Sequence, residues 1–153
     1  MKHLLIVHHS KTGRTARLAQ AILEGVCHPE IVGVEHRFLT ARQGGPEDLL
    51  WADAILLGTP ENFGYMSGAM KDFFDRTFYE VEGKVRPLPC AIFICAGNDG
   101  AGALRAIRRI IGGYPMSEVQ PAMVVRGEPT EGDLLACREL GMAVAAGLDA
   151  GIY

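Results

Sequence analysis

Short apolar runs alternate with segments of helical spacing along the whole chain, and this alternation restricts the fold more than any other feature of the sequence. The pattern is typical of strand–helix units that build a parallel sheet. The apolar runs predict five strands: Lys2–His8, Ile31–Phe38, Asp53–Gly58, Cys90–Cys95 and Val119–Val125. Charges interrupt the second run, which is therefore expected near a sheet edge. We predict one α/β domain over residues 1–153, a doubly wound five-stranded parallel sheet with helices on both faces.

Apolar residues at helical spacing fill the intervals between these runs. The first helix is expected from about Arg14 to Cys27, and a short helix over Glu47–Trp51. Residues suited to helix ends support these assignments: Pro29 after the first helix, Ser67 before the helix that carries Met70 to Phe78, and Thr130 with Asp133 at the start of the last helix.

The segment after the first strand is rich in hydroxyl groups and leads directly into a helix. It reads His8-His9-Ser10-Lys11-Thr12-Gly13-Arg14-Thr15. A helix start offers unpaired N–H groups and roughly half a positive charge, which together favour an anion. The glycine spacing fits neither the nucleoside-triphosphate loop nor the dinucleotide fingerprint. The segment therefore predicts a site for the terminal phosphate of a mononucleotide, although Ser and Thr are also common caps of ordinary helices.

Two further loops follow strands and carry unusual residues. Thr59–Met66, after the third strand, is a loop of turn formers with the aromatic residues Phe63 and Tyr65. Gly97–Gly102, after the fourth strand, is rich in glycine and would expose backbone N–H groups. Because ligands of doubly wound sheets bind beyond the carboxyl ends of the strands, we expect all three loops to form one site.

Two motifs resemble those of the flavodoxin-like FMN-binding family. Ser10–Thr15 matches that family's phosphate loop, [ST]-x-T-G-x-T. Gly58–Thr77 is similar to the segment GSPTxFGxMxxxMKxFLDRT of its NAD(P)H:quinone oxidoreductase group. The resemblance follows the whole chain in order and is strongest from Ala54 to Thr77. Of the two strand orders that right-handed crossovers allow, Rossmann-like or flavodoxin-like, it implies the second, 2-1-3-4-5.

The resemblance implies FMN as cofactor, with NADPH or NADH as reductant, and assigns its contacts by position. The residues implied at the phosphate are Ser10, Thr12, Gly13, Arg14 and Thr15. Those implied along the ring are Pro60, Glu61, Asn62, Phe63 and Gly64, and those at its far side are Gly97, Asn98, Asp99 and Gly100. Glu61 departs from the group's usual Thr and resembles the Pro-Glu of NADPH-dependent FMN reductases. A carboxylate at this position is expected to lower the potential of the flavin.

Several other side chains have two interpretations. His8 and His9 are either donors to the phosphate or substrate, or satisfied histidines at a strand end. Arg105, Arg108 and Arg109 form one basic helical face, which is either solvated or attracts an anionic partner. The Asp75–Arg76 pair and Trp51 are interpreted as structural.

Composition limits the remaining classes. The net charge of −3 is too small to indicate a nucleic-acid partner, and no apolar run approaches the length that spans a membrane. The four cysteines contain no CxxC pair, so we expect buried thiols and neither a metal site nor a disulfide framework. We expect a cytoplasmic protein and leave open whether it forms a homodimer.

The leading hypothesis is an FMN-dependent oxidoreductase in which NAD(P)H passes a hydride to the flavin and a quinone-like small molecule accepts the electrons. No side chain is an obvious acid or base, so no catalytic residue is assigned. The alternative is a flavodoxin-type carrier that moves single electrons between proteins. A regulatory module on the same scaffold is disfavoured, because the acidic cluster that it needs is replaced by His8, His9 and Ser10.

Overall fold

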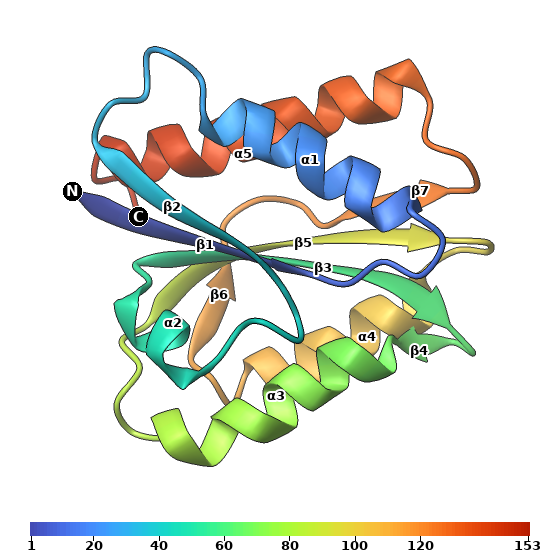
Figure 1. Ribbon diagram of the computed structural model, residues 1–153, viewed down its shortest axis with the longest axis horizontal. Coiled ribbons are helices and arrows are strands. Elements are labelled where there is room, and N and C mark those ends of the chain that lie inside the picture. The colour runs from blue at the N-terminus through green and yellow to red at the C-terminus, as the bar shows by residue number, and fades with distance from the viewer.

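A parallel sheet lies between two layers of helices (Figure 1). The computed structural model describes all residues from Met1 to Tyr153. The strands are β1 (Lys2–His8), β2 (Val34–Thr40), β3 (Ala54–Asn62), β4 (Tyr65–Met66), β5 (Leu88–Ala96), β6 (Met116–Glu118) and β7 (Met123–Arg126). The helices are α1 (Arg14–Val26), α2 (Pro46–Trp51), α3 (Gly68–Val81), α4 (Ala101–Ile111) and α5 (Glu131–Asp149). No helix is both long enough and apolar enough to cross a bilayer.

The order β2-β1-β3-β5-β6 confirms the predicted flavodoxin-like arrangement, with β2 at an edge. Alternation along the central strands divides the core in two, because successive side chains of a strand point to opposite faces. Leu4 and Ile6 pack with α1 and α5, whereas Leu5 and Val7 pack with α2, α3 and α4. Burying both faces of β1, β3 and β5 explains why the central residues of these strands are apolar.

The prediction of one continuous fifth strand over Val119–Val125 was wrong. Only its second half is a strand, β7, which pairs in parallel with the end of β5; a separate short strand, β6, precedes the predicted range and pairs in parallel with the beginning of β5. The chain leaves the sheet between them at Gln120–Ala122. Pro121, which has no N–H group to donate to a neighbouring strand, lies in this gap.

Two other boundaries also differ from the prediction. The second strand begins at Val34 rather than Ile31, because the Ile31 N–H donates to the His28 carbonyl in a turn that follows α1. The loop predicted at Thr59–Met66 is instead a β-hairpin. β3 continues through Pro60 to Asn62 and pairs with β4, so only two residues form the turn.

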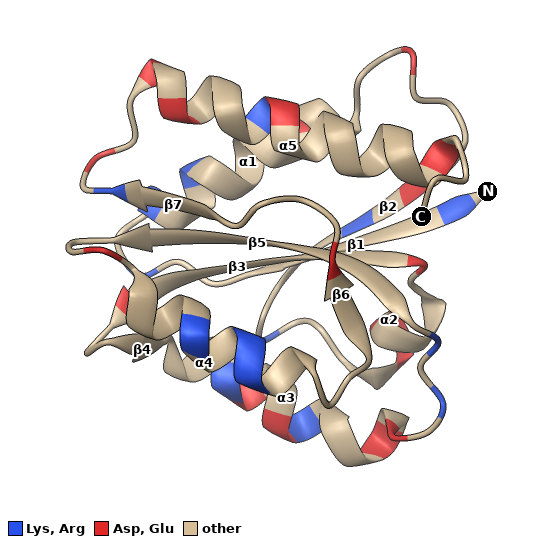
Figure 2. Cartoon of the chain, turned by 180° about the vertical axis from the view of Figure 1, so that it is seen from behind, with Lys and Arg blue, Asp and Glu red and all other residues tan.

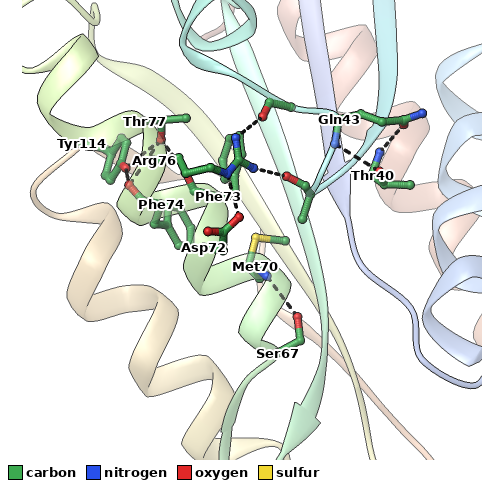
Figure 3. Close-up of polar contacts among 12 residues, drawn as sticks. Thr40, Gln43, Ser67, Met70, Asp72, Phe73, Phe74, Arg76, Thr77 and Tyr114 are labelled. Atoms are coloured by element: carbon green, nitrogen blue, oxygen red, sulfur yellow. Dashed lines mark hydrogen bonds and ion pairs between the residues drawn. The ribbon is translucent and has the colours of Figure 1, made fainter.

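Arg76 and Thr77, at the end of the motif Gly58–Thr77, have a structural role (Figure 3). Arg76 Nε donates to Asp72 on α3, and the guanidinium also donates to the carbonyls of Ala41 (2.8 Å) and Gly44 (3.1 Å). Thr77 Oγ1 lies 2.9 Å from the hydroxyl of Tyr114, in the segment after α4. These contacts tie the β2–α2 loop and the segment after α4 to α3.

The structure confirms the predicted helix caps at Ser67 and Thr130, but the predicted burial of Cys27 was wrong. The Ser67 hydroxyl accepts from Met70 N–H at the start of α3, and Thr130 and Asp133 form a reciprocal capping box on α5. Trp51 stacks on His3, with ring centroids 4.4 Å apart, as structural packing. Cys27 is exposed, however, because it caps the carboxyl end of α1, beyond the helix's buried stripe.

Candidate cofactor site

The carboxyl edge of β1, β3 and β5 brings the three predicted loops together. Between them is a hollow of about 130 Å³. Its lining residues are Lys11, Thr12, Arg14, Thr15, Pro60, Glu61, Asn62, Cys95, Ala96 and Gly97. A larger hollow of about 460 Å³ lies at the opposite end of the sheet, between Lys2, Leu88 and Tyr153, and includes no residue of the three loops. The smaller hollow is distinguished by free backbone N–H groups at the start of α1 and at Gly97–Asp99.

The start of α1 is prepared for an anion. Gly13 caps the helix with a left-handed backbone (φ 98°), and its N–H donates to Ser10 Oγ at 3.0 Å. No protein group accepts from the N–H groups of Arg14, Thr15 and Ala16. The first turn contains no acidic residue, and the Thr15 side chain is buried beneath it. Unpaired N–H groups at a helix start bind phosphate through hydrogen bonds and the helix dipole.

The start of α4 differs, because carboxylates already occupy it. Asp99 Oδ1 accepts from Ala101 N–H at 3.0 Å, and Glu61 Oε2 accepts from Ala103 N–H at 3.1 Å. Two negative groups at these donors disfavour a further anion. The phosphate of a cofactor therefore has one suitable helix start at this edge, that of α1.

The β3–β4 hairpin rests on α4. Both turn residues have positive φ, 52° at Phe63 and 69° at Gly64, as a two-residue type I′ turn requires. A Cβ atom on Gly102 would lie 2.0 Å from the Gly64 carbonyl oxygen, so the two backbones touch. The Glu61–Ala103 hydrogen bond lies beside this contact.

The β3–β4 hairpin and the loop that follows β5 offer the two surfaces that a flat ring needs. Phe63 is fully exposed at the tip, in a conformation that costs a bulky residue about 1 kcal/mol or more. On the other side, no protein group accepts from the N–H groups of Gly97, Asn98 and Asp99, and these three residues are exposed. These donors suit ring carbonyl oxygens, so the residues fit a flavin mononucleotide with its phosphate at α1.

The predicted site residues do not all line the hollow. Ser10 and Gly13 form the turn of the phosphate loop, and Phe63 and Gly64 lie at the exposed hairpin tip. Asn98 and Asp99 are exposed beside the hollow, and Gly100 is buried as the cap of α4. Sequence reasoning missed Cys95, which ends β5 in the wall of the hollow, and Glu128. Glu128 lies 114 positions from Arg14, whose Nε donates to it at 2.9 Å. No local pattern reveals such a distant partner.

His8 and His9 are only partly satisfied, because Nδ1 of each ring is buried without a hydrogen-bond partner. The His8 ring stacks on Phe38, with centroids 4.7 Å apart. Burial lowers the pKa of His8, a backbone hydrogen bond with Leu39 partly opposes this shift, and the neighbouring His9 adds to it. Burial and the positive charge of Arg42 lower the pKa of His9. Both rings are therefore held neutral at pH 7.

We expect His8→Phe to stabilise the protein by about 1 kcal/mol at pH 7, because it removes a buried nitrogen without a partner and keeps the stack on Phe38. In the wild type the unfolded chain binds more protons than the folded one once the pH falls below the ordinary pKa of 6.5, so stability is lost on acidification. His8→Phe should reduce this loss, as measured by urea unfolding at pH 7.5 and 5.5. Equal loss in both proteins would contradict the assignment; His36→Gln, on the exposed part of β2, is the control.

Comparison with known proteins agrees with this geometry. The family model described as NADPH-dependent FMN reductase matches residues 1–130. A flavodoxin from Aquifex aeolicus (strain VF5) is 30% identical, over 95% of this chain and 86% of that protein. An NAD(P)H dehydrogenase (quinone) from Archaeoglobus fulgidus is 28% identical, over 95% of this chain and 96% of that protein.

Solved structures show the same fold. A flavodoxin from the domain Archaea superposes with a TM-score of 0.82 at 25% identity, covering 95% of this chain and 98% of that one. A WrbA-like flavodoxin from Agrobacterium tumefaciens gives 0.77 at 23% identity, covering 98% of this chain and 99% of that one.

Proposed function

The chain belongs to the NADPH-dependent FMN reductase family, and from that premise we propose that it is an FMN-dependent oxidoreductase. It takes electrons from NADPH or NADH and passes them to a quinone or a similar small acceptor. The whole chain, residues 1–153, acts as one binding unit. The observation that carries the proposal is that the start of α1, with unpaired N–H groups and no acidic residue in its first turn, lies at the same edge as the β3–β4 hairpin and the free N–H groups of Gly97–Asp99.

The protein's own groups have separate tasks. Thr12, Thr15 and the first N–H groups of α1 bind the phosphate, with Ser10 holding the loop through Gly13. Phe63 covers one side of the ring, and the N–H groups of Gly97 and Asn98 donate to its carbonyl oxygens. Bound FMN supplies the electron transfer, while the protein supplies position and electrostatics.

The test is an anaerobic visible spectrum of the FMN-loaded protein before and after addition of NADPH, and then of NADH. Prompt bleaching by either nucleotide is expected. An FMN-loaded protein that does not respond to either, but is reduced by dithionite in single-electron steps, would contradict a reductase.

That contrary result would favour the second candidate, a flavodoxin-type electron carrier. The flavodoxin relative, which is similar over nearly the whole chain, gives this candidate specific support. Added quinone separates the two further, because a reductase should turn over with NADPH and quinone, whereas a carrier should need a protein donor.

Glu61 is expected to depress the potential of bound FMN, because its half-buried carboxylate forms no ion pair and lines the same hollow as the phosphate loop. Glu61→Gln keeps an acceptor for the Ala103 N–H and removes the charge. The midpoint potential should rise on the order of 30 mV, equivalent to about 1.4 kcal/mol for a two-electron couple. Spectroelectrochemistry measures it, with Glu82→Gln at the exposed end of α3 as control. An unchanged potential would show that Glu61 only holds the hairpin to α4.

A further inference from the structure

Glu128, in the loop between β7 and α5, binds two arginines of α1 with one carboxylate. Its Oε1 accepts from Arg14 Nε at 2.9 Å, and its Oε2 lies 3.4 Å from Arg17 Nη1. In Figure 2 this loop carries acidic colour near the basic start of α1, which lies behind β7. A fourth loop therefore reaches the phosphate loop, in addition to the three that the sequence indicated.

The position of Glu128 is fixed on both sides. Before it, the Gly127 N–H donates to the Ala96 carbonyl at 2.9 Å, and the Gly127 carbonyl lies 3.7 Å from Cys95 Sγ, in the wall of the hollow. After it, Pro129 is buried and the capping box of α5 begins at Thr130. The carboxylate is therefore held at the outer side of the phosphate loop.

Arg14 and Arg17 lie three positions apart, so their side chains share one face of α1 just outside the N–H groups that seat a phosphate. Two guanidinium groups at such a place would suit a second phosphate group joined to the first. In this chain the negatively charged carboxylate of Glu128 binds the two arginines in place of such a phosphate. The remaining basic residue of the loop, Lys11, lines the hollow itself and forms no ion pair.

Resting on the proposed function, we propose that Glu128 determines cofactor size. It neutralises the arginines that would bind a second phosphate and so restricts the cradle of α1 to a flavin monophosphate. A flavin joined to a nucleotide through a diphosphate, such as FAD, must place its second phosphate against this carboxylate.

The experiment compares FMN, FAD and riboflavin as ligands of the full chain freed of flavin, by quenching of flavin fluorescence at low salt. Glu128→Gln should lower the ratio of the dissociation constants for FAD and FMN about tenfold, and less at high salt, because the charges are exposed and screened. The double variant Glu128→Gln with Arg17→Gln should return the ratio towards that of the wild type. Glu24→Gln is the matched control, since it removes an ion pair to Arg138 farther along the same helix.

A ratio in Glu128→Gln within twofold of the wild type would overturn the inference. So would equal weakening of FMN and FAD, since Glu128 would then only orient Arg14. Failure of the wild type to bind FMN at all is a different result, and it would overturn the proposed function instead. Riboflavin, which has no phosphate, should bind the wild type and Glu128→Gln alike, and a change in its affinity would show damage beyond the phosphate loop and overturn the inference.

Discussion

A chain carrying Thr12→Val and Thr15→Val is expected to lose at least about a hundredfold in FMN affinity. Hydrogen bonds to charged groups contribute about 1.5–3 kcal/mol each, and two are removed. Thr15 is buried and Val has nearly its shape, so the fold should persist. Fluorescence titration of the flavin-free protein measures the dissociation constant.

Riboflavin provides the internal control for this variant. It has the ring but no phosphate, so its affinity should be the same in the variant and in the wild type. If a folded variant bound FMN with unchanged affinity, the assignment of the phosphate to the start of α1 would be wrong. Equal loss for both ligands would show that the substitutions had damaged the ring surface as well.

Local chemistry explains which parts of the fold the sequence predicts. The alternating central strands, the edge position of β2 and the caps at Ser67 and Thr130 depend on neighbours within a few residues. The phosphate loop is similarly local, because Ser10 and Gly13 form the turn that starts α1.

The features that sequence reasoning missed depend on distant neighbours. Pro60 and Asn62 have turn-forming composition, yet β3 continues through them because Glu61 pairs with Met66 and bonds to α4. The fifth predicted strand is shorter than expected because two separate strands, β6 before it and β7 at its end, pair with different ends of β5. The role of Glu128 becomes visible only in the fold, where β7 brings it next to α1.

Gly102→Ala is expected to separate the hairpin from α4 and to weaken FMN binding at least about tenfold, because two backbones touch there and neither can rotate away. Overpacking of this kind costs about 1–3 kcal/mol, partly offset by the better helix propensity of Ala. Titration with FMN and riboflavin should show both weakened, since the affected surface holds the ring.

This result separates the two halves of the site. Gly102→Ala should affect riboflavin, whereas the threonine variant should not, because one change acts at the ring and the other at the phosphate. Gly68→Ala, in the first turn of α3 with open space around it, is the matched control and should leave both affinities unchanged. If Gly102→Ala spared riboflavin, the hairpin would not form the ring surface, and the flavin would be held from the phosphate end alone.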